Sequence, residues 1–456
     1  MSLRKKEADA LGTLPVGKLL VRLAVPSIFA QTVALLYNIV DRIFIARISG
    51  AGSLALAGLG VTAPIITLLS AFANLVGMGG APLCAIELGR GNIKRARAIL
   101  WNSFLLVTAF SIMLTGAILS FKKPLLYLFG ATDDTISFAS AYISICAGAC
   151  LPGMLALALN AFLVTQGCNR ENMLFVLAET VLNIILDLLF ISIMHWGITG
   201  AAVATVISQT VSALCILGFL RIKRTVLRLL PAPIDVDILW HICSLGFATF
   251  SMTATEGAVV AVFNRQLAHY GNDIYIAAFS IIFTISQFVL TPVYGINQGG
   301  QPIISYSFGE QKKERLVQAI RYILIADLTC SLITTLAIEL FPETLLALFT
   351  SDEAVLAVGK SMLRIFVLGR VLSGLQWGVQ TTFRAMGNAL FPIIVMGIRK
   401  IVLIIPLAYF IPWLTGIGTT RVLLAEPISD FISVLCAMLI FFYFYRSTIS
   451  GRANAL

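Results

Sequence analysis

Two aspartates stand inside stretches that are otherwise apolar enough to lie in hydrocarbon. Asp187 falls within VLNIILDLLFISIM, and Asp41 falls within LLYNIVDRIFIA. A carboxyl group in such a place is costly whether it is ionised or neutral, so an acid in a membrane-embedded segment is a functional hypothesis from the start. Two of them predict a site that binds a proton or another cation.

Helix geometry places the two aspartates at a similar depth. Asp41 and Asp187 each lie seven residues before the outer end of a predicted span, which is about 10 Å at about 1.5 Å per residue. Thr205 reaches the same level, and Asn183 shares the helix face of Asp187 because it lies four residues earlier. We therefore expect these four residues to form one cation-coupling pocket. The alternative for the two aspartates is a buried structural acid paired with a neighbouring Arg, and the alternative for Asn183 and Thr205 is that they bridge helices.

The elements that must position these residues are transmembrane helices. The chain has 456 residues, of which 59% are hydrophobic and only 12% charged, and apolar runs long enough to span a bilayer recur along it. We predict an all-α integral membrane protein with twelve spans, at 16–48, 54–80, 98–120, 136–165, 172–194, 198–220, 238–268, 274–300, 318–341, 357–384, 391–413 and 422–446. Continuous runs of this length do not fit a β-barrel.

The net charge of +10 reflects membrane topology rather than nucleic-acid binding. Basic residues gather before the first span and after the second, sixth and eighth spans, whereas alternate loops such as MHWGITG nearly lack them. By the positive-inside rule, both termini are expected in the cytoplasm, which agrees with an even number of spans. The eight cysteines form no CxxC motif, so the sequence predicts neither a disulfide framework nor a metal site, and no cofactor.

An internal repeat sets the domain organisation. Segments after spans two and eight resemble each other, and a shift of 220 residues relates Pro82 to Pro302 and Gly89 to Gly309. We predict two six-helix lobes, 1–220 and 238–456, joined by a cytoplasmic linker at 221–237 and related by a pseudo-twofold axis along the membrane normal. The same shift places Ala261 and Leu407 at the positions of the two aspartates, so the acidic pair belongs to the first half alone.

Further polar residues in the spans are candidate binding residues. Glu256 is a third acid within a span; it is either a second cation site, a contact for a cationic substrate, or a partner for a buried arginine such as Arg370 or Arg399. Pro26 precedes Asp41 in the first span and is a candidate hinge, with a static kink as the alternative. Side chains that could furnish a pocket for amphipathic cations include Gln31, Tyr37 and Gln287.

At these residues the chain resembles the multidrug and toxin extrusion (MATE) family of bacterial exporters. The resemblance runs nearly end to end, through LAVPSIFAQTVALLYNIVDRIFIARISG, IELGRGN, TQGCNREN and QPIISYSFGEQK. It implies that Asp41, Asn183, Asp187 and Thr205 match the family's proton-site pattern and that Asn160 matches a drug-contacting Asn in span four. The sodium-coupled branch carries acids in spans seven and ten. Glu256 matches the first of these, but RIFVLGRVLSGLQWGVQTTF has no acid in span ten.

The sequence thus predicts a secondary active multidrug or organic-cation exporter of the cytoplasmic (inner) membrane, not an enzyme. We expect a monomer that works as a cation-coupled antiporter driven by protons, with sodium bound at Asp41 and Asp187 as the alternative. Its expected partners are small amphipathic or cationic organic compounds and membrane lipids, with no nucleic acid. The rival functions are a flippase of a lipid-linked precursor or polyketide and an intramembrane enzyme, although clustered His, Cys or paired acids near a basic loop are missing from the sequence.

Overall fold

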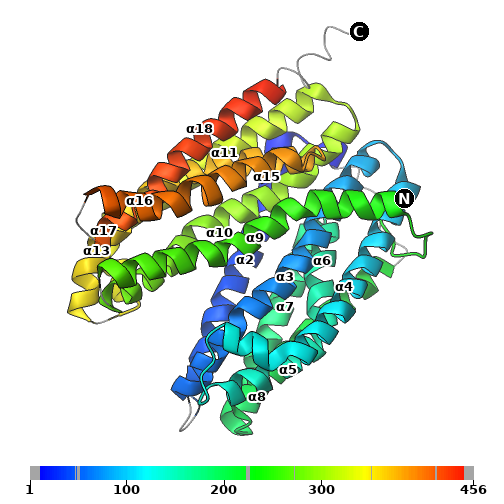
Figure 1. Cartoon of the computed structure of the whole chain (residues 1–456). Helices are drawn as coiled ribbons and strands as arrows, with labels where there is room; N and C mark the ends of the chain where they lie inside the picture. The colour runs from blue at the N-terminus through cyan, green and yellow to red at the C-terminus, as the bar shows by residue number, and fades with distance from the viewer. Residues whose placement is uncertain are drawn as a thin grey trace. The chain divides into compact units, whose positions relative to one another are not determined.

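The computed structural model describes residues 11–46, 48, 52–221, 226–271, 273–350, 352–415 and 419–445. These residues are almost entirely helical, as the sequence predicts, and Figure 1 shows the helices coloured along the chain. The terminal segments 1–10 and 446–456, which we expect in the cytoplasm, lie outside the described residues, as does 222–225 of the linker.

The helices follow one another with short connections. In the first half they are α2 (Val16–Ala46), α3 (Gly52–Gly89), α4 (Ile93–Leu128), α5 (Ile136–Gly148), α6 (Cys150–Thr165), α7 (Asn169–Asp187), the π-helix η1 (Leu188–Ile193) and α8 (Gly197–Arg221). In the second half they are α9 (Val236–Tyr270), α10 (Asp273–Gly309), α11 (Lys313–Leu340), α12 (Pro342–Ala347), α13 (Glu353–Leu368), α14 (Arg370–Ala385), α15 (Leu390–Gly397), the π-helix η2 (Ile398–Ile404), α16 (Ile405–Thr415), α17 (Thr419–Val422) and α18 (Ala425–Phe444).

Each of the twelve predicted spans coincides with a helix or with a broken helix. Among the described residues, ten helices are long and apolar enough to cross a membrane, or eleven if α5 and α6, which meet at 58°, count as one span. The predicted span 357–384 consists of α13 and α14, which have 16 residues each and meet at Gly369. Each is too short to cross a bilayer alone, since a span needs about 20 residues.

Helices α3 and α10 extend nine residues beyond their predicted ends, to Gly89 and Gly309. Glycines at the predicted ends of these spans pack closely on neighbouring helices. A Cβ built on Gly79 would lie 2.1 Å from the Ile242 carbonyl oxygen, and one on Gly299 would lie 2.6 Å from the Ala24 nitrogen. Falling hydropathy marked the span ends in the sequence, but both helices continue past the end of the apolar run.

The chain forms two compact units whose boundaries differ from the predicted lobes at two places. The first unit comprises 1–14 and 29–250, and the second comprises 15–28 and 251–456. The start of α2 therefore belongs to the second unit, and the start of α9 belongs to the first. The two boundaries, after residues 28 and 250, differ by 222 residues, close to the repeat shift of 220, so both halves break at nearly equivalent positions.

Within the first unit, α3 packs against α4 and α6, and α7 packs against α8 (Figure 1). The linker is fastened to this unit by three polar side chains. The Arg97 guanidinium donates to the Val226 carbonyl oxygen at 3.2 Å, the Gln166 side-chain oxygen accepts from the Leu227 nitrogen at 3.0 Å, and Asn102 bonds to backbone groups of 233 and 235. The described part of the linker is therefore ordered against the first unit.

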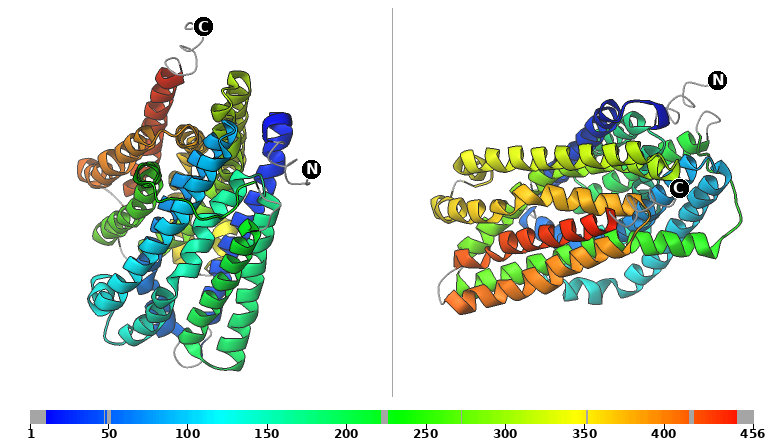
Figure 2. Two further views of the ribbon diagram at one scale, coloured as in Figure 1. Left: turned by 90° about the vertical axis from the view of Figure 1, so that its right-hand side faces the viewer. Right: turned by 90° about the horizontal axis from the view of Figure 1, so that it is seen from above.

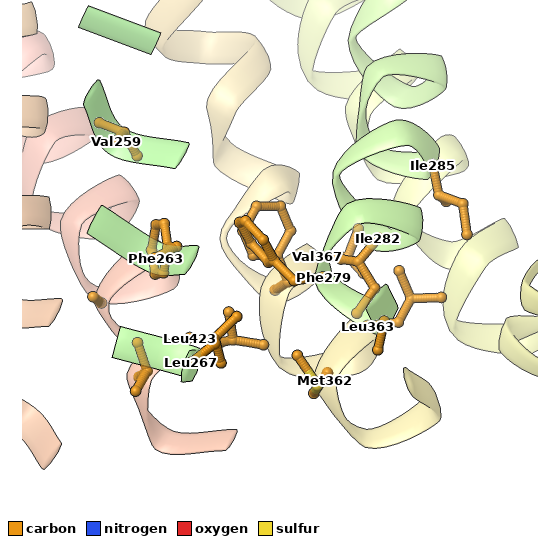
Figure 3. Close-up of a cluster of buried hydrophobic side chains, with 14 of the residues drawn as sticks. Val259, Phe263, Leu267, Phe279, Ile282, Ile285, Met362, Leu363, Val367 and Leu423 are labelled. Carbon is orange, nitrogen blue, oxygen red and sulfur yellow. The ribbon is translucent and has the colours of Figure 1, made fainter. Parts of the chain in front are cut away.

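Within the second unit, α11 packs against α10 and α14, and α14 packs against α18 (Figure 2). The core of this unit is a cluster of aromatic and aliphatic side chains, among them Phe263 of α9, Phe279 of α10 and Phe366 of α13. Figure 3 shows part of this cluster. The rings meet at centroid distances of 5.3 to 6.4 Å, the range of favourable aromatic pairs. This packing holds α9, α10 and α13 together around the second unit's charged groups.

Candidate functional site

Asp187 ends α7 inside the first unit and is completely buried. Asn183 precedes it by one turn, so both side chains project from the same face of the helix. The six-residue π-helix η1 begins at the next residue. Such π-helical segments are rare and often mark functional sites, because they widen the helix and redirect its side chains.

The amide of Asn183 links Asp187 to the neighbouring helix α8. In the orientation that satisfies both of its ends, its nitrogen donates to Asp187 Oδ2 at 2.8 Å and its oxygen accepts from the Thr205 backbone nitrogen at 3.3 Å. The Thr205 hydroxyl lies 3.4 Å from the Tyr37 hydroxyl, which projects from α2. A hydrogen-bonded chain therefore joins α7, α8 and α2.

Asp41 of α2 completes the group. Its side chain is buried, and its carboxyl group lies within hydrogen-bonding reach of Asp187. Two carboxyl groups can form a hydrogen bond only when one of them carries a proton, because an ionised carboxylate is an acceptor only. The four residues expected to form a cation-coupling pocket thus lie together, with Tyr37 as a fifth member.

Glu179 is an acid of the same helix face that the sequence analysis missed. It lies one turn before Asn183 in AETVLNIILD, so its position was readable from the helical period. Its side chain is half-buried and hydrogen bonds to Ser212 of α8, and it interacts electrostatically with the Tyr37 hydroxyl. The polar face of α7 therefore extends for two turns from Asp187 back toward the start of the helix, as far as Glu179.

The remaining predicted binding residues are distributed over both units. Asn160 of α6 is half-buried, and its Oδ1 atom has no hydrogen-bond partner among the residues that the structure describes. Gln31 is half-buried in the part of α2 that belongs to the first unit, whereas Pro26 and Gln287 belong to the second. α2 continues as one helix past Pro26, so the helix is not broken at this proline.

Glu256 of α9 has a basic partner that is neither of the two arginines named as alternatives. Its carboxylate forms a short ion pair with Lys400 of η2, whose ammonium also donates to the Met252 carbonyl oxygen at 2.8 Å. Arg399, one of the two arginines named as alternatives, instead binds Asp430 at 2.6 Å and Glu426 at 2.7 Å on α18. Adjacent residues of a helix point in different directions, so Arg399 and Lys400 serve different neighbours.

Arg370 joins the same network. It stands at the first position of α14, and its guanidinium lies 3.1 Å from the Glu426 carboxylate. Three basic side chains therefore face three acidic ones within the second unit: Arg370, Arg399 and Lys400 with Glu256, Glu426 and Asp430. The network is balanced in charge, which lowers the cost of burying it.

The acids of the two units thus differ in their partners. In the first unit, Asp187 and Glu179 form no ion pair with any Lys or Arg among the described residues, whereas each acid of the network in the second unit has a basic partner. No group of three or more His, Cys, Asp and Glu side chains in the described ranges could hold a metal ion. The carboxyl pair of the first unit is therefore the candidate site for a small cation.

Comparisons with known proteins place the chain in a family. The chain is 26% identical over 435 residues to the multidrug export protein MepA of Staphylococcus saprophyticus, with 93% of each chain covered, and 26% identical over 428 residues to MepA of Staphylococcus aureus strain MRSA252, again with 93% of each covered. A crystal structure of a MATE protein in the bent conformation superposes with a TM-score of 0.91 at 24% identity, covering 99% of both chains; at that identity the likeness shows the fold. The MatE family model matches residues 26–189 and 249–410, and the chain therefore belongs to the multidrug and toxin extrusion (MATE) family of membrane transporters.

Proposed function

We propose that this protein is a secondary active exporter that exchanges protons for organic cations or similar amphipathic compounds. It acts as a monomer in the bacterial cytoplasmic (inner) membrane, with both termini in the cytoplasm. The names of its relatives support export of several unrelated compounds, since the two MepA proteins are multidrug export proteins. The basic loops support the orientation.

The observation that carries the proposal is the contact between the carboxyl groups of Asp41 and Asp187. Two ionised carboxylates in a buried site repel each other strongly, and a proton bound between them removes that repulsion. The pair therefore takes up a proton when it faces an acidic solution and releases it when another positive charge approaches. Proton and cationic substrate exclude each other on this account, which is the requirement for antiport.

The hydrogen-bonded chain around the pair supports a route by which proton binding reaches the helices. Asn183 and Thr205 belong to α7 and α8, and Tyr37 belongs to α2. When Asp187 changes its charge, the amide nitrogen of Asn183 gains or loses an ionised acceptor, and the chain between α7, α8 and α2 tightens or loosens. Pro26, in the same helix as Asp41, is the proposed hinge on which α2 responds.

The ion pair between Glu256 and Lys400 in the second unit favours protons over sodium as the coupling ion. Glu256 is the one acid that matches the sodium-coupled branch, and Lys400 already supplies its positive charge. In the first unit we assign the proton, or sodium as the alternative, to the carboxyl pair. Substrate contacts are assigned to Asn160, Gln31 and Tyr37 in the first unit and to Glu256 and Gln287 in the second, because polar and aromatic side chains can orient an amphipathic cation.

The test is transport into vesicles that contain the purified protein. An imposed pH gradient should drive uptake of an organic cation such as ethidium into vesicles with an acidic lumen, whereas a sodium gradient of the same size should not. Asp41→Asn and Asp187→Asn should abolish uptake, and Glu171→Gln, at the first turn of α7, serves as the control. Wild-type uptake by a folded Asp187→Asn protein would refute the assignment, and uptake driven by sodium alone would refute the proton.

A further inference from the structure

A buried acid in the second unit has no place in the account so far. Asp327 lies in the middle of α11, within YILIADLTCSLITTL, and its side chain is completely buried. The sequence analysis singled out no residue of this span. An acid at such a depth needs a partner or a proton, because an isolated buried carboxylate costs several kcal/mol.

One of its two oxygen atoms is held firmly. Asp327 Oδ2 accepts from the Asn297 side-chain nitrogen of α10 at 2.9 Å, and the same nitrogen donates to the Val293 carbonyl oxygen at 2.8 Å. On the other side, a Cβ built on Gly378 of α14 would lie 2.7 Å from Oδ2. Only glycine leaves room for the carboxyl group at this place, so the site is closely fitted to it.

The other oxygen atom, Oδ1, has no hydrogen-bond partner among the described residues. The hydroxyl groups of Ser331 and Thr335, one and two turns along α11, are also buried and lack partners there, as does Asn297 Oδ1. Ser331 packs on Gly374 of α14, whose built Cβ would lie 2.3 Å from Oγ. The region around Asp327 therefore holds several buried polar atoms, both donors and acceptors, that have no partner among the described residues.

Among the residues that the structure describes, no basic side chain forms an ion pair with Asp327. On α14, Arg370 binds Glu426, and Arg384 donates to Thr381 and has a further interaction. On α13, Arg364 pairs with Glu339. On α10, the ring of Tyr294 packs against Trp377, and at the start of α2 both Lys18 and Arg22 are exposed. The other titratable group near Asp327 on its own helix is the thiol of Cys330. The positive charge that Asp327 requires is thus missing from the helices packed against it.

We propose that Asp327 is a second proton-loading site of the exporter, in the unit that lacks the carboxyl pair. The carboxylate takes up a proton at Oδ1, since Oδ2 already accepts from Asn297, and the resulting O–H has oxygen acceptors on its own helix and on α10. The neutral acid is far cheaper to bury than the ion. This inference rests on the proposed proton antiport: the proton on Asp327 is exchanged in each cycle and adds to the number moved per substrate.

The experiment measures how steeply substrate accumulates with the pH gradient. Vesicles with an acidic lumen take up tetraphenylphosphonium, with the membrane potential clamped at zero by potassium and valinomycin. At steady state the accumulation ratio rises about tenfold per pH unit for each proton exchanged, because a tenfold ratio corresponds to about 1.4 kcal/mol. This ratio depends on stoichiometry and not on turnover, so a slow variant can still be compared.

Asp327→Asn should lower the steady-state ratio by about tenfold at a gradient of about one pH unit, and Asp327→Ser, which is smaller and avoids Gly378, should do the same. The exposed acid Glu314 at the start of α11 provides the control, and Glu314→Gln should match the wild type. A wild-type ratio in both Asp327 variants would overturn the inference and leave the proposed antiport intact. A wild type that accumulates nothing under a pH gradient would instead overturn the antiport itself.

Discussion

Replacing Arg399 by Met should destabilise the second unit strongly. Arg399 neutralises Asp430, which is completely buried, and Glu426, whose side chain is 5% exposed, at distances of 2.6 and 2.7 Å. Removing one partner of a buried ion pair leaves an uncompensated charge and costs about 3–5 kcal/mol. For a unit of about 200 residues, about 2–4 °C per kcal/mol gives a fall in Tm of roughly 6–20 °C.

The assay is thermal unfolding of the purified protein in detergent, followed by the fluorescence of a thiol-reactive dye. The matched control is Arg364→Met, because Arg364 is half exposed and lies 3.6 Å from Glu339; such surface pairs contribute about 0–1 kcal/mol. Adding Asp430→Asn to Arg399→Met should recover part of the loss, since Asp430 is the acid that loses its basic partner, whereas Glu426 keeps Arg370. Equal Tm values for Arg399→Met and Arg364→Met would refute the account of the network.

Three further substitutions test other parts of the structure. Gly246→Ala should destabilise the first unit or abolish its folding, because the added Cβ would lie 1.8 Å from the Leu75 carbonyl oxygen. The control Gly218→Ala, whose added Cβ has nothing within 4 Å, should be neutral or stabilising by up to about 1 kcal/mol. Equal thermal stability of the two variants would contradict this prediction. Pro26→Ala should reduce turnover more than substrate binding, because it restores a backbone donor in α2; normal transport with weakened binding would show that the proline only shapes the pocket. Lys400→Met should leave Glu256 without its counter-charge and make transport by this variant respond to sodium; an unchanged sodium response with a folded protein would show that Glu256 needs no cation.

The sequence was sufficient for what depends on helical periodicity. Apolar runs gave the spans, and the spacing of four residues put Asn183 and Asp187 on one face. Counting residues from the span ends also brought Asp41 and Thr205 to the same depth, and the structure brings these residues into contact. Their role in coupling remains a proposal.

What depends on contacts between distant segments was not predictable in the same way. The partner of Glu256 is 144 residues away in the chain, and nothing in a single sequence distinguishes Lys400 from its neighbour Arg399. The assignment of 15–28 to the second unit and of 236–250 to the first likewise cannot be predicted from the repeat, because a repeat shows only that one half duplicates the other. Asp327 was missed for a different reason. An acid within an apolar span is visible in the sequence, so Asp327 could have been identified as a candidate without the structure.

The most direct test of the central claim is the pH dependence of substrate affinity. Proton and substrate compete on this account, so the Kd of the wild-type protein for ethidium, measured by fluorescence anisotropy in detergent, should rise as the pH falls, by up to about tenfold per pH unit for each proton displaced. In Asp187→Asn the remaining acid Asp41 loses its carboxyl partner, and the Kd should vary much less with pH. A wild-type Kd that does not change with pH, or an Asp187→Asn protein with the same slope as the wild type, would contradict the account.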